Sequence, residues 1–285
     1  MNGFFFIDKE KGMTSFDVVR NIRRMIGEKK VGHSGTLDKL AEGLLIVAVG
    51  QGTKLLEYLI GFDKEYEVVG RFGYVSDTFD SDGEVVKTDF SGEVSESEIL
   101  ESISGFTGEI SQMPPKYSAL KVGGRRASDI VRSGEKVELK ARNIRIDDFE
   151  IVEYDWPEVR FRVSCSSGTY IRSLINDLGE KLGCGGYVGD LRRTKIGSFS
   201  VGDAVILEVL GKNVDQRLIS MEEMGRNFAT IDLSDEEFEG LKDGKVLLDK
   251  KLEQEGVVVA FYGGKAVGVV ENDKGGIKFS KVWWS

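Results

Sequence analysis

A loop framed by glycines and followed by an uninterrupted apolar run constrains the fold of this chain more than any other feature. Residues 32–43 read GHSGTLDKLAEG, with glycines at positions 32, 35 and 43. Glycine permits positive φ angles and lets the backbone come close to a ligand, so this spacing predicts a shaped loop. Residues 44–49 are all apolar and end at Gly50, which is typical of a strand. The segment therefore predicts a shaped loop that leads directly into a strand.

The loop holds Asp38 between apolar neighbours, and two interpretations of this carboxylate are open. An acidic group beside leucines can act in catalysis, because partial burial and a chosen partner set its protonation. Asp38 can equally well cap a short helix that begins at Lys39. The single histidine of the chain, His33, lies in the same loop, and by itself a histidine between glycines predicts an exposed loop residue.

Strand-like and helix-like segments follow one another without a regular βαβ alternation, so we expect an α+β fold. Thr14 and Ser95 are expected to cap helices that end near Gly27 and Gly105. Ser167 or Thr169 is expected to cap a third long helix. A short helix is expected at 53–60, and strands at 4–7, 44–49, 65–72, 143–153 and 158–165.

Two composition changes divide the chain. Pro114-Pro115 precedes a basic stretch in which Gly123-Gly124 permits a mobile hairpin or lid, and we call residues 114–145 the thumb. A second change near 226–230 precedes small strands and glycine turns. The expected organisation is one domain over 1–226 and a small, mostly β module over 227–285.

The charge distribution is uneven, although the net charge of the 285 residues is −9. Residues 116–145 carry nine Lys or Arg against three acids, and residues 9–30 carry seven against three. These stretches are either ordinary solvated faces or patches that attract a polyanion such as RNA.

Several whole classes of protein are not expected. No apolar run approaches the ~20 residues that span a bilayer, and the two cysteines with one histidine predict neither a metal site nor structural disulfides. We expect a cytoplasmic protein in which Cys165 is a buried, inert thiol.

Seven motifs, in order along the chain, resemble the TruB family of tRNA pseudouridine synthases: DK at 8–9 with GMTS at 12–15, GHSGTLDKLAEG at 32–43, DKEY at 63–66, DTFDSDG at 77–83, PPKYSALK at 114–121, CSSGTYIR at 165–172 and LRR at 191–193. The resemblance covers residues 4–200, and the tail resembles the PUA RNA-binding module. It implies a mixed-sheet catalytic domain and an isomerase that converts a uridine of the tRNA T-loop, conventionally position 55, to pseudouridine. It also implies a monomer that acts on the T-arm stem-loop without a cofactor, a metal or an obligatory protein partner.

The resemblance assigns a role to individual residues. Asp38 is the catalytic carboxylate, which attacks C6 of uracil, attacks C1′ or acts as a base at C2′. Arg172 is its partner, although without the resemblance an arginine in a first helical turn predicts a surface residue. Tyr66 stacks on the flipped uracil, although without the resemblance a tyrosine on an alternating strand predicts a packing residue. Asp80 is expected to form a hydrogen bond near the site, although residues 80–83 also suit an ordinary turn. The other expected substrate contacts are Tyr170 and Leu191 at the pocket, His33 in the T-loop, and Lys121, Arg125, Arg126 and, more weakly, Lys9 on phosphates.

Two departures and two rival functions accompany this resemblance. The family usually has proline where this chain has Glu10 and Lys39. One rival is a guide-RNA-dependent synthase that needs protein partners, which the basic thumb disfavours. The other is a tRNA-binding folding chaperone without required catalysis, which the Asp38, Tyr66 and Arg172 positions disfavour.

Overall fold

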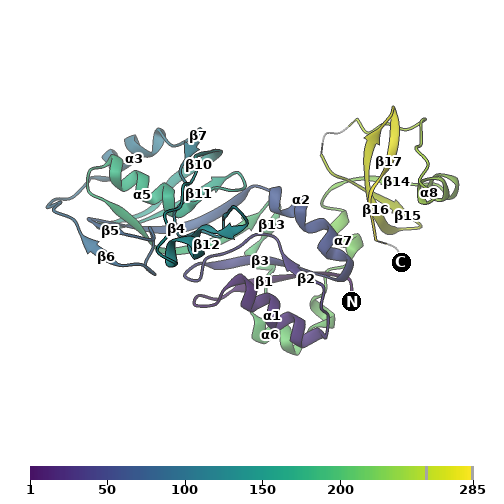
Figure 1. The fold of residues 1–285 in the computed structure, drawn as a ribbon, viewed down its shortest axis with the longest axis horizontal. Coiled ribbons are helices and arrows are strands. Elements are labelled where there is room, and N and C mark those ends of the chain that lie inside the picture. The colour runs from purple at the N-terminus through teal and green to yellow at the C-terminus, as the bar shows by residue number, and fades with distance from the viewer. Residues whose placement is uncertain (254–255, 284–285) are drawn as a thin grey trace.

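A mixed β-sheet organises most of the molecule, whose computed structural model describes residues 1–253 and 256–283. The sheet has nine strands in the order β1-β3-β12-β4-β11-β10-β7, with β2 paired to β3 and β13 to β12 (Figure 1). Only β3 and β12 run parallel among its pairs, which confirms the expected α+β class. The bounds are β1 Gly3–Lys9, β2 Val31–His33, β3 Glu42–Val49, β4 Lys64–Phe72, β7 Gly108–Gln112, β10 Arg142–Asp155, β11 Glu158–Cys165, β12 Gly186–Ile196 and β13 Phe199–Ser200.

Strand β3 explains why the run at 44–49 is apolar throughout. Leu45, Val47 and Val49 face one hydrophobic core, whereas Leu44 and Ile46 belong to a second core on the other side of the sheet. Side chains alternate between the faces of a strand, so a strand covered on both faces has no position left for a polar residue. The strand predicted from this run is confirmed.

Helices α1, α3, α5 and α6 contribute to the first core. Thr14 and Ser95 form complete capping boxes with Asp17 and Glu98, as predicted. The short helix expected at 53–60 is split into a 3₁₀ turn, η1, and α2. The bounds are α1 Ser15–Ile26, η1 Gly50–Leu55, α2 Leu56–Gly61, α3 Glu96–Ser104, α5 Ile171–Lys181, η2 Val201–Asp203, α6 Leu207–Lys212, η3 Asp215–Arg217 and α7 Met221–Gly225.

The prediction that Ser167 or Thr169 caps α5 is wrong. The N-cap residue is Tyr170, and its side chain makes no capping bond. The Thr169 hydroxyl instead donates to the Ser166 carbonyl over 2.9 Å. The side chain of Gln112 accepts from the Tyr170 N–H over 2.8 Å, so a residue from β7 fixes the entry into α5.

The thumb contains a small hairpin and a helix. Strands β8 (Lys121–Val122) and β9 (Arg125–Arg126) pair across Gly123-Gly124, and α4 (Ala127–Arg132) follows at once. Both glycines have positive φ angles, 57° and 86°, which a side chain would strain. The predicted hairpin is confirmed.

A four-stranded sheet follows the nine-stranded sheet in the chain and lies on the right of Figure 1. Its strands are β14 Ala229–Asp232, β15 Val258–Tyr262, β16 Lys265–Asp273 and β17 Gly276–Val282, with α8 Asp235–Lys242 beside them. Val259, Phe261 and Val269 from this sheet share the second core with Phe4 and Leu44. The small sheet is therefore joined to the larger one through a shared apolar cluster, to which α7 also contributes.

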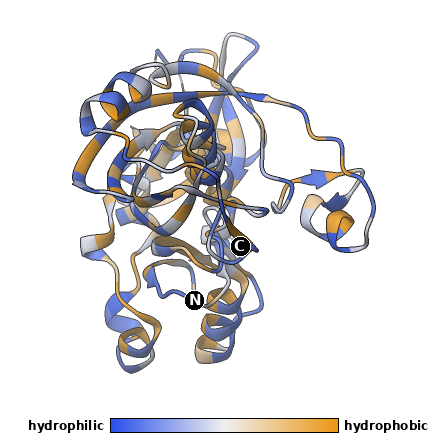
Figure 2. Cartoon of the chain, turned by 90° about the vertical axis from the view of Figure 1, so that its left-hand side faces the viewer, coloured by the Kyte–Doolittle hydropathy of each residue, from blue (hydrophilic) through white to orange (hydrophobic). Residues whose placement is uncertain are grey.

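Hydrophobic residues concentrate in the central strands, and hydrophilic residues are frequent in the outer loops (Figure 2). A separate hairpin, β5 (Tyr74–Ser76) with β6 (Val85–Lys87), lies at the left end of the molecule in Figure 1. Within residues 1–253 and 256–283, no helix has the length and apolar character needed to cross a membrane.

Candidate active site

The loop between β2 and β3 is held from two directions. The Ser15 hydroxyl donates to the Leu37 carbonyl over 3.2 Å and accepts from the Leu37 N–H over 2.8 Å, which ties the loop to α1. A Cβ at Gly43, whose φ is 102°, would lie 2.3 Å from the Arg193 carbonyl oxygen, so only glycine fits against β12. No helix begins at Lys39. The interpretation of Asp38 as a helix cap is therefore wrong.

Arg172 lies in the first turn of α5 and points at this loop. Its Nε is 2.9 Å from Oδ2 of Asp38, and its Nη1 is 3.2 Å from Oδ2 of Asp80. The Nε–H is not aligned with the Asp38 oxygen, so this contact is an ion pair without a well-formed hydrogen bond. The Arg172 side chain is 4% exposed and Asp38 is 39% exposed. The interpretation of Arg172 as a surface residue is wrong.

Two backbone carbonyls fix the Arg172 guanidinium further. Nη1 donates to the Thr78 carbonyl over 2.8 Å, and Nη2 donates to the Tyr117 carbonyl at the base of the thumb over 2.9 Å. A guanidinium held at both ends cannot follow its partner, because its planar donors are already committed. Asp38, whose side chain is 39% exposed, is consequently the less constrained member of the pair.

Asp80 is buried behind Arg172 and does not line the cavity. Its carboxylate accepts from the Thr78 hydroxyl over 2.5 Å and from the Asp82 N–H over 3.0 Å. Burial raises the pKa of Asp80, while the Thr78 hydroxyl and the Arg172 cation oppose that rise. The arrangement makes Asp80 a residue that positions Arg172.

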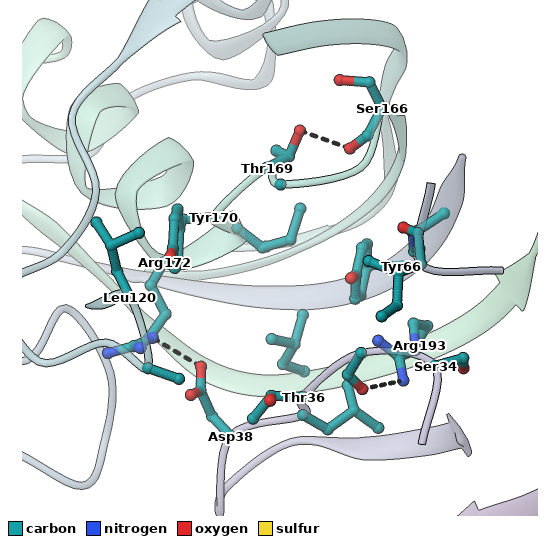
Figure 3. Close-up of a pocket in the computed structure, with 18 residues that line it drawn as sticks. Ser34, Thr36, Asp38, Tyr66, Leu120, Ser166, Thr169, Tyr170, Arg172 and Arg193 are labelled. Carbon is teal, nitrogen blue, oxygen red and sulfur yellow. Dashed lines mark hydrogen bonds and ion pairs between the residues drawn. The ribbon is translucent and has the colours of Figure 1, made fainter. Parts of the chain in front are cut away.

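A cavity of about 310 Å³ opens in front of the Asp38–Arg172 pair. This volume is at the lower end of the ~300–1,000 Å³ of small-molecule pockets and is suited to one planar ring with its substituents. Tyr66 lies across the cavity from Asp38, and Tyr170 lies above the pair (Figure 3). Segments far apart in the sequence build this cavity: the 34–38 loop, α2, β4, residues 119–120 of the thumb, the entry of α5 and β12. Leu191 on β12 also lines it, so the predicted pocket residues Tyr170 and Leu191 both belong to the cavity.

Two buried cations in the cavity wall were not predicted as site residues, although both lie in the recognised motifs. Arg193 is 1% exposed, and it donates from Nε to the Leu44 carbonyl over 2.8 Å and from Nη2 to the Gly35 carbonyl over 3.2 Å. Lys64 donates to two carbonyls at the end of α2, and burial lowers its pKa to about 8. Burial is the largest influence on Tyr66 as well, and it raises the pKa of that phenol.

The remaining predicted residues lie outside the cavity. His33, at the end of β2, accepts a bond on Nδ1 from the Gly35 N–H over 3.2 Å, and its pKa is lowered by burial and by Arg193. Lys121, Arg125 and Arg126 are exposed on the thumb, and Arg125 forms an ion pair with Glu135 over 2.9 Å.

Lys9 requires a correction. Its side chain is fully buried, its ammonium donates to the Met13 carbonyl over 2.8 Å, and burial lowers its pKa to about 8. Because it does not reach the surface, it cannot clamp a phosphate there. The structure makes Lys9 an internal brace of the turn before α1.

Cys165 is buried, and burial raises its pKa to about 12. A thiol that is protonated at neutral pH is not a nucleophile, as predicted. Within the described ranges, no cluster of three or more His, Cys, Asp or Glu side chains could hold a metal ion.

Comparisons with known proteins cover nearly the whole chain. Residues 23–171 match the family model described as "TruB family pseudouridylate synthase (N terminal domain)". Residues 172–226 match "tRNA pseudouridylate synthase B C-terminal domain". The two models meet at Arg172, within the cavity.

Relatives named tRNA pseudouridine synthase B are similar over most or nearly all of their length. The protein from Clostridium tetani is 37% identical over 287 residues, which is 99% of both chains. The protein from Aquifex aeolicus is 38% identical over 281 residues, 97% of both chains. The protein from Clostridium acetobutylicum is 42% identical over 254 residues, 88% of this chain and 87% of the relative.

Solved structures with the same fold include a chain of an H/ACA RNP bound to a substrate RNA, with a TM-score of 0.75 at 23% identity. A chain of a Cbf5-Nop10-Gar1 complex also has a TM-score of 0.75, at 24% identity. Each alignment covers 99% of this chain and 85% of the other. At this identity the likeness establishes the fold.

Proposed function

The chain belongs to the TruB family of pseudouridylate synthases, and we propose that it isomerises one uridine in the T-loop of tRNA, position 55 by convention, to pseudouridine. One observation carries this proposal: the Asp38–Arg172 ion pair, at 2.9 Å, faces a cavity of about 310 Å³ that Tyr66 closes from the other side. A single flipped pyrimidine nucleotide is a substrate of suitable size and shape. The relatives named tRNA pseudouridine synthase B support tRNA as its source.

The reaction breaks the N1–C1′ bond of uridine, turns the base and joins C5 to C1′, with loss of the proton from C5 and gain of a proton at N1. In our proposal Asp38 carries the chemistry, because it is the carboxylate that both lines the cavity and is the less constrained member of its pair with Arg172. Attack at C6, attack at C1′ and proton removal from C2′ are all open to a carboxylate in this position. Arg172 offsets its charge and limits its orientation.

The base must leave its stack before it reaches Asp38, which costs a few kcal/mol. Tyr66 offers a ring on which the uracil can stack, and stacking on an aromatic side chain is worth about 1–3 kcal/mol per base. In the proposal His33, next to the cavity, takes the space that the extruded nucleotide leaves. Lys121, Arg125 and Arg126 bind phosphates and contribute affinity rather than base selection.

We propose that the enzyme acts alone, without a guide RNA or an obligatory protein partner, as a cytoplasmic monomer. The support is the thumb, whose exposed basic residues supply within one chain a surface for the RNA backbone. We also propose that the small C-terminal sheet is a PUA-like module that binds RNA.

Release of tritium from tRNA that carries C5-tritiated uridine tests the function, because only the formation of the C5–C1′ bond expels this hydrogen. Wild type is expected to release tritium, and Asp38→Asn is expected to release none while it binds tRNA within about tenfold of wild type, or ~1.4 kcal/mol. Activity in Asp38→Asn would contradict the catalytic assignment. Tight binding by wild type without any release would support the folding chaperone instead.

A further inference from the structure

The outward face of α1 combines an exposed aromatic ring with arginines. Phe16 is 58% exposed, although it is a large apolar residue. The Cζ atoms of Arg20 and Arg23 lie 5.9 Å and 6.0 Å from the centre of its ring. The opposite face of the helix is committed to the core through Val18, Val19 and Ile22.

The cations on this face are only partly neutralised. Arg20 forms an ion pair with Asp17, and Arg23 donates to the Val31 carbonyl over 3.0 Å. Arg24, Lys29 and Lys30 are exposed and form no ion pair in the described part of the chain. A surface with unpaired cations around an aromatic ring attracts a polyanion and offers a plane for stacking.

Two contacts join this face to the proposed active site. The hydroxyl of Ser15, the residue directly before Phe16, binds the carbonyl and the N–H of Leu37 in the 34–38 loop. The bond from Arg23 to Val31 joins the last turn of α1 to β2, the strand that ends at His33. An RNA strand that leaves the cavity along this side would therefore meet the α1 face next.

We propose that Phe16, Arg20, Arg23 and Arg24 form a further RNA-binding surface, which holds the sugar-phosphate backbone of the tRNA whose uridine occupies the cavity. The arginines bind phosphates, and Phe16 stacks on a nucleobase or packs on a ribose. This inference rests on the proposed function, and it extends the substrate contact beyond the cavity and the thumb. A partner protein or an anionic membrane is the alternative occupant.

The test uses Arg20→Gln with Arg24→Gln, because glutamine keeps the helix propensity and removes two charges from one face. The affinity for full-length tRNA is measured against salt concentration for this variant and for wild type. Each lost phosphate contact lowers the slope of log K against log salt by about one. We expect the slope to fall by one to two and the affinity to fall about tenfold at low salt. The rate at saturating tRNA is expected to stay unchanged, since these side chains do not line the cavity.

A matched control removes two charges elsewhere. Of these two cations, Lys87 forms no ion pair with any residue that the structure describes, and Arg160 pairs with Glu153 at 3.4 Å, so the control is Lys87→Gln with Arg160→Gln. This is the same combination as on α1. Lys87 lies in the β5–β6 hairpin, away from α1 (Figure 1). The control is expected to bind tRNA with the wild-type slope.

Phe16→Ala is expected to weaken binding about three- to tenfold with an unchanged salt slope. The proposal would be overturned if the Arg20/Arg24 variant kept the affinity and the salt slope of wild type, or if the control pair lost as much affinity. It would also be overturned if wild type bound liposomes rich in anionic lipid and the variant lost this binding while its affinity for tRNA stayed unaltered. The proposed function fails separately: wild type would then bind tRNA through α1 but release no tritium.

Discussion

Arg172 pairs with two carboxylates, Asp38 and Asp80, so the same chemical change can be made at a partly exposed position and at a buried one. Asp38→Asn and Asp80→Asn each remove one charge next to one guanidinium and preserve the shape of the side chain. The Asp38 side chain is 39% exposed and that of Asp80 is 4% exposed. We expect the first variant to lose activity while it keeps its stability, and the second to lose stability while it keeps part of its activity.

The structure gives the magnitudes. Loss of a partly exposed ion pair costs about 0–1 kcal/mol, and in Asp38→Asn the buried Arg172 still has Asp80 at 3.2 Å. Removal of one partner of a buried pair costs ~3–5 kcal/mol, because an uncompensated charge remains. For Asp80→Asn we expect about 3 kcal/mol, the lower end, since burial already raises the pKa of Asp80 and so penalises its charged form.

Urea denaturation gives the free energy of unfolding, and tritium release gives kcat and KM. Asp38→Asn is expected to abolish measurable turnover, a loss beyond the ~10²–10⁴-fold scale of a positioned acid or base. Asp80→Asn is expected to lower kcat about 10–100-fold with KM little changed, because Arg172 is misplaced rather than removed. If both variants were equally destabilised, or if Asp38→Asn were destabilised more, the reasoning that Asp38 serves catalysis and Asp80 holds Arg172 in place would be refuted.

Three further predictions concern residues around the cavity. Tyr66→Phe should keep the KM of wild type within about twofold, whereas Tyr66→Ala should raise KM by a factor that corresponds to the ~1–3 kcal/mol of a lost base stack. Equal effects of the two variants on KM would argue against stacking. Arg193→Met should lower the free energy of unfolding in urea by about 1–3 kcal/mol, because two buried carbonyls lose their donor; an unchanged value would show that the brace is dispensable. Because the pKa of His33 is lowered in the folded protein, the unfolded chain binds its proton first as pH falls through 6.5, so stability is lost there. The free energy of unfolding of wild type should therefore drop more steeply than that of His33→Gln between pH 7 and 5, and parallel curves would contradict this.

Local signals in the sequence were sufficient for most of the secondary structure. The Thr14 and Ser95 caps, the apolar run of β3 and the Gly123-Gly124 turn each depend on residues within a few positions of one another. The prediction of a cap at Ser167 or Thr169 failed because the Tyr170 N–H binds Gln112, 58 positions away in the chain. A side chain from another strand is invisible to any local rule.

The sequence by itself determined the family, the α+β class and the residues that gather around the cavity, because seven motifs in order identify positions even when their geometry is unknown. Only the tertiary structure decided what surrounds each of them. It placed Arg172 inside the molecule between two carboxylates and two carbonyls. It also buried Lys9 below the surface, where its ammonium cannot bind a phosphate. It also brought Arg193 and Lys64 to the cavity wall. Burial and the choice of partner depend on segments that meet only when the sheet has formed, and these two quantities decide what a charged side chain does.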